Sequence, residues 1–224
     1  MNVAKFFHLY TGELDTNTYI VINGREGFVV DPGGEADEIF KIFKREKARI
    51  VAILLTHAHF DHIAGVKALS DLQRNLAGGE ECYAPKILMH KNELAKINSY
   101  KNMGFSKGVQ VDKFVPDVLL SGGENINVAG LDIKVILTKG HSEGSVCYVV
   151  DNKIFCGDTI FFMSYGRTDF PGGSEKELKN SIINKLFRLK GNYTLLPGHG
   201  EPSTLDFERV NNPILEKTPH VIAD

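Results

Sequence analysis

The stretch THAHFDH, residues 56–62, carries three histidines and one aspartate within six consecutive positions. It directly follows the continuous apolar run IVAILL, which is typical of a strand buried on both faces. A solvated loop would explain the polarity but not the composition, because each imidazole needs partners for its ring nitrogens. His57 and His59 point the same way in an extended chain and can bind one ion together. Asp61 and His62 come in the next turn of chain and face a second position, so the stretch predicts a metal site.

Four other apolar runs end in the same way, in a polar turn that contains glycine. They precede Asp31 in FVVDPGG, His141 in VILTKGHSEGS, Asp158 in IFCGDTI and His199 in TLLPGHG. Turns at the strand ends of a rigid sheet are where binding sites are usually built. Each of these residues alone is a weak ligand candidate, but together His141, Asp158 and His199 supply what a two-metal site still lacks.

The composition is that of an ordinary soluble globular protein, with 42% hydrophobic and 24% charged residues in a chain of 224. A net charge of −2 gives no support to a nucleic-acid or membrane partner, since both favour basic patches. No apolar run is long enough to span a membrane, and the N-terminus lacks the features of a signal peptide. The three cysteines, Cys82, Cys147 and Cys156, have no metal-type spacing and are expected to fill core positions, which favours a reducing cytoplasm.

Hydrophobic periodicity predicts an α+β chain. Strands are expected over residues 17–22, 26–31, 50–55, 86–90, 131–138, 145–150 and 153–157, and a strand followed by a turn over 193–200. Helices are expected over 36–50, from 63 to 72, over 92–97, over 174–191 and over 203–212, with an irregular loop over 99–114. No low-complexity linker divides the chain. The order of the elements therefore predicts one domain over residues 1–224, with two sheets covered by helices on their outer faces.

The motif H-x-H-x-D-H, taken with the three downstream ligand candidates, resembles the metallo-β-lactamase superfamily. The segments GHSEGSVCYV, CGDTIF, GRTDFPGGS and LLPGHGEPST are similar to its glyoxalase II-like branch. The resemblance covers nearly the whole chain. It implies a four-layer αββα sandwich of two mixed β-sheets flanked by helices, with a binuclear metal site at one edge.

The resemblance also implies a role for each site residue. The first metal would be bound by His57, His59 and His141, the second by Asp61, His62 and His199, and Asp158 would bridge the two ions. Asp31 would brace the loops, and Thr56 is a second candidate for that role. These ligand types suit zinc first, with iron and manganese as alternatives, so two divalent metal ions are the expected cofactors.

The expected reaction is hydrolysis of an ester or thioester in a small molecule, of the S-2-hydroxyacylglutathione kind. Two ions about 3.5–4 Å apart can share a hydroxide and polarise a carbonyl oxygen. Asp61 and Asp158 are the expected catalytic residues, with Asp61 helping to orient the hydroxide. The sequence offers no convincing Ser-His-Asp or Cys-His arrangement as another source of a nucleophile.

Candidates for substrate binding follow Asp158 in the segment SYGRTDFPGG. Tyr165 and Arg167 could offer a hydroxyl and a guanidinium group to a substrate carboxylate. The alternative is that Arg167 pairs with Asp169 and holds the loop. Lys139 is a further candidate for an anionic substrate group. The irregular loop supplies candidates for a pocket wall, namely Tyr100, Phe105 and Lys107.

Two features leave the substrate and the chemistry open. Full-length glyoxalase II enzymes carry a C-terminal helical extension that helps to hold glutathione, and this extension is not expected in the 24 residues after Gly200. The alternative function is an iron oxygenase that resembles persulfide dioxygenases, with His57, His141 and Asp158 as its iron ligands. Phosphodiester hydrolysis is disfavoured by the lack of a basic stripe, and a purely structural metal site by its closed coordination. A homo-oligomer is compatible with the sequence.

Overall fold

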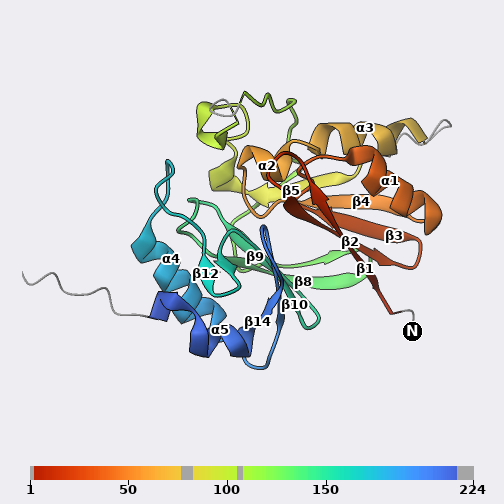
Figure 1. Cartoon of the computed structure of the whole chain (residues 1–224). Helices are drawn as coiled ribbons and strands as arrows, with labels where there is room; N and C mark the ends of the chain where they lie inside the picture. Colours follow the sequence, from red (N-terminus) through yellow and green to blue (C-terminus); the bar gives the residue numbers. More distant parts are fainter. Residues whose placement is uncertain (1–2, 77–82, 105–107, 216–224) are drawn as a thin grey trace, which may run out of the picture.

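Two six-stranded sheets lie face to face at the centre of the molecule (Figure 1). The computed structural model describes residues 3–76, 83–104 and 108–215. The first sheet has the order β1-β2-β3-β4-β5-β6, formed by Lys5–Thr11, Thr16–Asn23, Glu26–Val30, Arg49–Leu54, Lys86–His90 and Val118–Leu120. The second has the order β14-β13-β10-β9-β8-β7, formed by Ser203–Thr204, Thr194–Pro197, Lys153–Gly157, Val146–Val150, Leu131–Leu137 and Asn125–Val128. Both sheets are mixed, because each contains parallel and antiparallel pairs.

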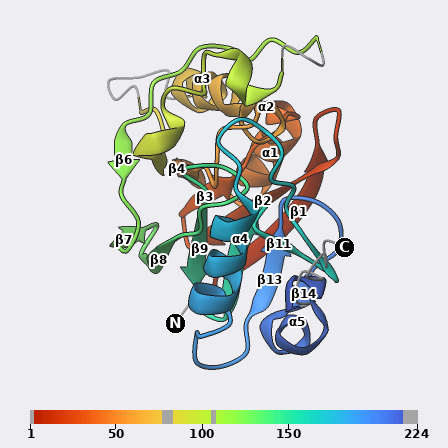
Figure 2. The ribbon, with the colours of Figure 1, turned by 90° about the vertical axis from the view of Figure 1, so that its left-hand side faces the viewer.

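Helices cover the outer face of each sheet (Figures 1 and 2). The first sheet is covered by α1 (Ala36–Arg45), α2 (Phe60–Ile63) and α3 (Val66–Leu76), and the second by α4 (Glu175–Ser181), a π-helical turn at Ile182–Leu186 and α5 (Leu205–Asn211). A small hairpin, β11 (Ile160–Phe161) and β12 (Ser164–Tyr165), lies outside the two sheets. The predicted four-layer αββα architecture is confirmed.

The continuous apolar strands are explained by burial on both faces. Along β2, Tyr19 and Val21 pack between the two sheets, whereas Ile20 and Ile22 pack under α1 and α3. This alternation follows from the two-residue period of a strand. Cys147 and Cys156 fill the core between the second sheet and its helices, as expected, whereas Cys82 lies outside the described residues.

Several predicted elements have different bounds. The helix predicted from residue 63 to 72 is two helices, which end at Ile63 and begin at Val66. Glycine fits at position 65 between them, because a Cβ there would lie 2.8 Å from the carbonyl oxygen of Pro32. The helix predicted over 36–50 ends at Arg45, since Lys47 takes a positive φ of 54° and Ile50 already belongs to β4. The prediction over 92–97 was wrong in extent, because only Lys91–Glu93 forms a short 3₁₀ turn.

Strands β6 and β7 were not among the predicted elements, and further differences concern β1 and the helix after Ser174. Strand β1 was not predicted, and it pairs along its whole length with β2. The helix predicted over 174–191 changes to π-helical hydrogen bonding at Ile182. Ser174 caps its N-terminus, because the backbone N–H of Glu177 donates to the Ser174 hydroxyl at 3.3 Å. The helix predicted over 203–212 is α5.

Candidate metal centre

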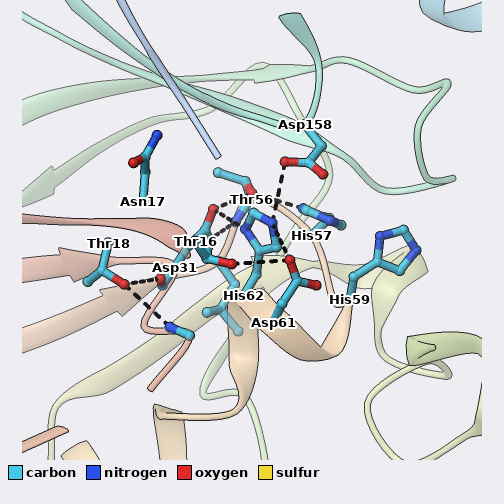
Figure 3. A network of polar contacts seen from close by, with 12 residues as sticks. Thr16, Asn17, Thr18, Asp31, Thr56, His57, His59, Asp61, His62 and Asp158 are labelled. Carbon is cyan, nitrogen blue, oxygen red and sulfur yellow. Dashed lines mark hydrogen bonds and ion pairs between the residues drawn. The ribbon is translucent and has the colours of Figure 1, made fainter. Parts of the chain in front are cut away.

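The predicted ligands converge at one edge of the paired sheets. Figure 3 shows those of residues 57–62 together with Asp158. They stand in the segments that follow five strands: Asp31 after β3, residues 56–62 after β4, His141 after β8, Asp158 after β10 and His199 after β13. These segments are far apart along the chain, and the two sheets bring them together. The structure therefore places every predicted ligand at one site, at the strand ends that the sequence indicated.

One group is formed by three buried histidines, His57, His59 and His141. Nε2 of His141 lies 3.2 Å from Nε2 of His57 and 2.8 Å from Nδ1 of His59. The backbone carbonyl of Arg167 accepts a hydrogen bond from Nδ1 of His141 at 2.8 Å, which fixes this ring with Nε2 toward the group. Burial, followed by the neighbouring His141, lowers the pKa of His59 to about 3. Three neutral imidazole nitrogens thus face one position, as a metal ion requires.

A second group is formed by Asp61, His62 and His199. Nε2 of His199 lies 3.0 Å from Oδ2 of Asp61, and Nε2 of His62 lies 3.4 Å from the same oxygen. Burial opposes the charge on Asp61, but His62 and the hydrogen bond from His199 outweigh it and lower the pKa of the carboxyl. This group offers one carboxylate and two imidazoles to a second cation.

Asp158 stands between the two groups. Its Oδ1 lies 3.4 Å from Nε2 of His62, and its Oδ2 lies 3.5 Å from Nε2 of His141 and 3.8 Å from Nε2 of His199. Each carboxylate oxygen therefore faces a different set of imidazoles. This placement is what the predicted bridging role needs.

The charges of the site fit cations. Asp31, Asp61 and Asp158 surround the buried His62, and in the described part of the chain their ion pairs are with histidines. Burial opposes a charge on His62, but these carboxylates raise its pKa well above the ordinary value. Nε2 of His62 and Oδ1 of Asp158 are buried and lack hydrogen bonds. Buried carboxylates need compensating charge, and metal ligation by these two atoms would satisfy both needs.

Asp31 and Thr56 hold the ligand loops, as predicted for them. The backbone N–H and the hydroxyl of Thr56 donate to the two carboxylate oxygens of Asp31 at 2.7 and 2.6 Å. Nδ1 of His62 lies 2.9 Å from Oδ2 of the same carboxylate. Asp31 lies close enough to His57 and His62 to be considered a ligand itself. Its oxygens are already occupied by these partners, so we assign it the bracing role.

Two bracing residues in β2 were missed by the sequence analysis. The hydroxyl of Thr16 donates to Oδ2 of Asp61 at 3.2 Å (Figure 3). The side-chain amide of Asn17 donates to the carbonyls of Pro197 at 2.9 Å and Gly200 at 2.8 Å, on either side of His199. The signal was a run of three polar residues at the start of an otherwise apolar strand, TNTYIVI.

A third missed residue, Glu93, lies behind the three-histidine group. Its Oε2 accepts the backbone N–H of Ala58 at 3.0 Å, and its Oε1 accepts the backbone N–H of Gly144 at 2.7 Å and the hydroxyl of Ser142. The ammonium group of Lys96 lies 3.3 Å from Oε1, and both side chains are buried. Glu93 thus connects the loop of His57 and His59 with the loop of His141.

A pocket of about 480 Å³ opens onto the ligands. Tyr165 and Arg167 line it, whereas Lys139 lines a separate hollow with Glu143 and Glu177. Arg167 donates two hydrogen bonds to Asp169, from Nε at 2.7 Å and from Nη2 at 2.6 Å, which is the pairing considered as the alternative. Of the proposed pocket wall, Phe105, Lys107 and the side chain of Tyr100 lie outside the described residues.

Residues 11–199 match the family model described as the metallo-beta-lactamase superfamily. A probable metallo-hydrolase of Bacillus subtilis, YqgX, is 33% identical over 94% of this chain and 97% of its own length. The hydroxyacylglutathione hydrolase GloC of Haemophilus influenzae is 30% identical over 84% of this chain and 86% of its own length.

Two solved structures are also similar to this chain over nearly its whole length. The B3 metallo-beta-lactamase BLEG-1 has a TM-score of 0.86 and 33% identity, over 95% of this chain and all of that one (100%). TTHA1623 in a di-iron-bound form has a TM-score of 0.80 and 30% identity, over 93% of this chain and 100% of that one.

Within the residues that the structure describes, no helix is both long and apolar enough to cross a membrane.

Proposed function

Because the chain belongs to the metallo-beta-lactamase superfamily, we propose that it is a metal-dependent hydrolase of esters or thioesters, with S-2-hydroxyacylglutathione compounds as the reference class. The observation that carries the proposal is the position of Asp158 between two complete groups of ligands, at the floor of an open pocket. The likeness to a hydroxyacylglutathione hydrolase supports the thioester class. The sequence offers no convincing Ser-His-Asp or Cys-His arrangement as a competing source of a nucleophile.

The residues present fit two divalent ions, with zinc proposed first and iron or manganese as alternatives. His57, His59 and His141 would hold the first ion, and Asp61, His62 and His199 the second, with Asp158 shared. A bound pair of this kind supplies a water-derived nucleophile at neutral pH and polarises the substrate carbonyl.

The chain's own groups prepare the site for this chemistry. Asp61 and Asp158 both line the pocket, so each can accept a hydrogen bond from a water there and orient it toward the substrate. The carbonyl of Arg167 holds the proton of His141 on Nδ1. Tyr165 lines the same pocket, and we propose that its hydroxyl donates to a substrate oxygen.

The alternative, an iron persulfide dioxygenase, needs only His57, His141 and Asp158 as ligands. The second group would then have no role in the chemistry. Its completeness, and the neutralising contacts of Asp61 with His62 and His199, favour the two-metal hydrolase.

A turnover panel on metal-quantified protein tests the proposal. Its compounds are S-lactoylglutathione, simple thioesters and esters, and glutathione persulfide with oxygen uptake recorded. We expect thioester hydrolysis that is lost with a chelator and restored by added divalent metal. Asp158→Asn should lose this activity, whereas Asp132→Asn, on the exposed face of β8, should retain it. Oxygen uptake without hydrolysis of any ester would contradict the proposal.

Lys139 is tested in the same assay. Lys139→Ala should leave the KM for lactoylglutathione unchanged if its separate hollow takes no part in binding. A rise in KM with unchanged kcat would restore Lys139 as a binding residue.

A further inference from the structure

We propose that the pocket selects substrates with an apolar acyl group, which lies between the aromatic rings of Phe161 and Phe170. The inference rests on the proposed hydrolase function and names the substrate class of that site. It is carried by the position of the two rings beside the two ligand groups. It is also carried by the ion pair that Arg167, the arginine in the pocket lining, forms with Asp169.

The two rings lie beside different ligand groups, Phe170 beside the first and Phe161 beside the second. The Phe170 ring meets that of His59 edge to face, with ring centroids 5.4 Å apart, and lies 6.5 Å from that of His141. The Phe161 ring lies 6.4 Å from that of His199, in the second group. Both phenylalanines line the pocket. A carbonyl that reaches Asp158 therefore carries its acyl group past one or both rings.

The rest of the wall is also largely apolar. Leu14 comes from the turn between β1 and β2, Phe60 from α2, and Met103 from the irregular loop. Besides the ligand residues, the polar groups that line the pocket are those of Ser164, Tyr165 and Arg167. A hydrocarbon acyl group would remove this apolar surface from water, whereas a hydroxyl or carboxylate there would need a partner.

The guanidinium group of Arg167 is already paired, so it is not preset to bind a substrate carboxylate. Its guanidinium group is bound to Asp169 by two hydrogen bonds and lies 3.9 Å from the centroid of the Phe170 ring. Its backbone carbonyl meanwhile accepts the proton of His141. Arg167 is thus a positioning residue, which fixes Phe170 against the three-histidine group. Among the described residues that line the pocket, it is also the single lysine or arginine.

The acyl preference is measured with thioesters that share one thiol, so that the leaving group stays constant. The probes are the acetyl, butyryl, hexanoyl, lactoyl and succinyl thioesters of N-acetylcysteamine, with metal-loaded enzyme. Burial of a methylene group corresponds to about fourfold in affinity, so kcat/KM should rise by up to about fourfold per methylene from acetyl to hexanoyl. The lactoyl compound should fall below butyryl, and succinyl should be the slowest.

Variants locate the effect in the two rings. Phe161→Ala and Phe170→Ala should flatten the series, by lowering the ratio of the hexanoyl rate to the acetyl rate about tenfold or more. The matched control is Phe162→Ala, because Phe162 is 48% exposed and stacks on Phe207, away from the pocket. It should keep the full series. Metal content and melting temperature, measured for each variant, show that the ligand groups are intact.

The outcomes separate the inference from the function on which it rests. Turnover with a flat series, or with lactoyl or succinyl preferred, overturns the apolar acyl preference and leaves the hydrolase proposal standing. A slope that Phe161→Ala and Phe170→Ala leave unchanged overturns the assignment to these rings. No turnover of any thioester or ester overturns the proposed function and the inference with it.

Discussion

The carboxylate of Glu93 accepts the backbone N–H of Ala58, which lies between the ligand candidates His57 and His59, at 3.0 Å. The same carboxylate accepts the hydroxyl of Ser142, the residue after His141. One buried anion thus holds both loops of the three-histidine group. Its place in the sequence, in a segment predicted to be an ordinary short helix, gives no sign of this role.

Substitution of Glu93 should therefore affect both stability and the first metal site. Glu93→Gln leaves the ammonium group of Lys96 buried without its carboxylate, which typically costs about 3–5 kcal/mol in the free energy of unfolding. Lys96→Met should cost less, because Glu93 keeps three other donors. Urea unfolding of both variants and of the double variant measures these energies.

Metal affinity shows whether Glu93 positions the loops of the three-histidine group or serves only the ion pair with Lys96. The double variant, Glu93→Gln with Lys96→Met, should regain stability relative to Glu93→Gln but still release its first metal more readily to a chelator. Glu143→Gln, at an exposed position in the loop of His141, is the matched control. Normal metal affinity in the double variant would show that Glu93 serves the ion pair only.

The two ligand groups should lose metal independently. His57→Ala removes an imidazole from the first group and His199→Ala one from the second, so each variant should bind about one equivalent where we expect the native protein to bind two. Asp158→Asn should weaken both sites, because its oxygens face both groups. Elemental analysis after gel filtration gives the stoichiometry. Two equivalents retained in His199→Ala would contradict the assignment of the second group.

Asp31 should act on metal affinity without binding metal. Asp31→Asn keeps the size of the side chain but replaces one acceptor oxygen with a donor, so the bonds from Thr56 or His62 are lost. Loss of such a brace typically lowers metal affinity by about 10–100-fold. Asparagine also tolerates the positive φ of 50° found at this position. Competition with a chromogenic chelator measures the change, and an unaltered affinity would remove Asp31 from the site.

The buried Cys147 thiol should make stability fall at high pH. Burial raises its pKa from 9.0 to about 11. The folded protein then keeps a proton that the unfolded chain loses, so the stabilisation is intact below pH 9 and is lost as the pH rises toward 11. A two-unit difference corresponds to about 3 kcal/mol. In urea unfolding between pH 8 and about pH 10.5, Cys147→Ala should show a shallower decline than the native protein, and parallel curves would contradict this.

The ligand groups could be predicted because their signal is local. Each candidate follows an apolar run directly, and strand ends of one sheet meet at the same edge. The layers were predictable for the same reason, since runs such as residues 50–55 are apolar on both faces only when both faces are buried. Strand β1 was not predicted because its burial pattern is mixed, with exposed and half-buried positions along KFFHLYT.

The sequence by itself determined the candidate ligand types, their order along the chain and the two-sided strands that bring them to one edge. The tertiary structure decided the residues that hold them: Asn17 reaches carbonyls 180 and 183 residues away, and Glu93 joins loops 35 and 49 residues distant. It also placed the Arg167 side chain on Phe170 and Asp169, a contact that the sequence had left as one of two alternatives. A hydrogen bond between distant segments depends on how the sheets pack, and no local pattern of residues records that packing.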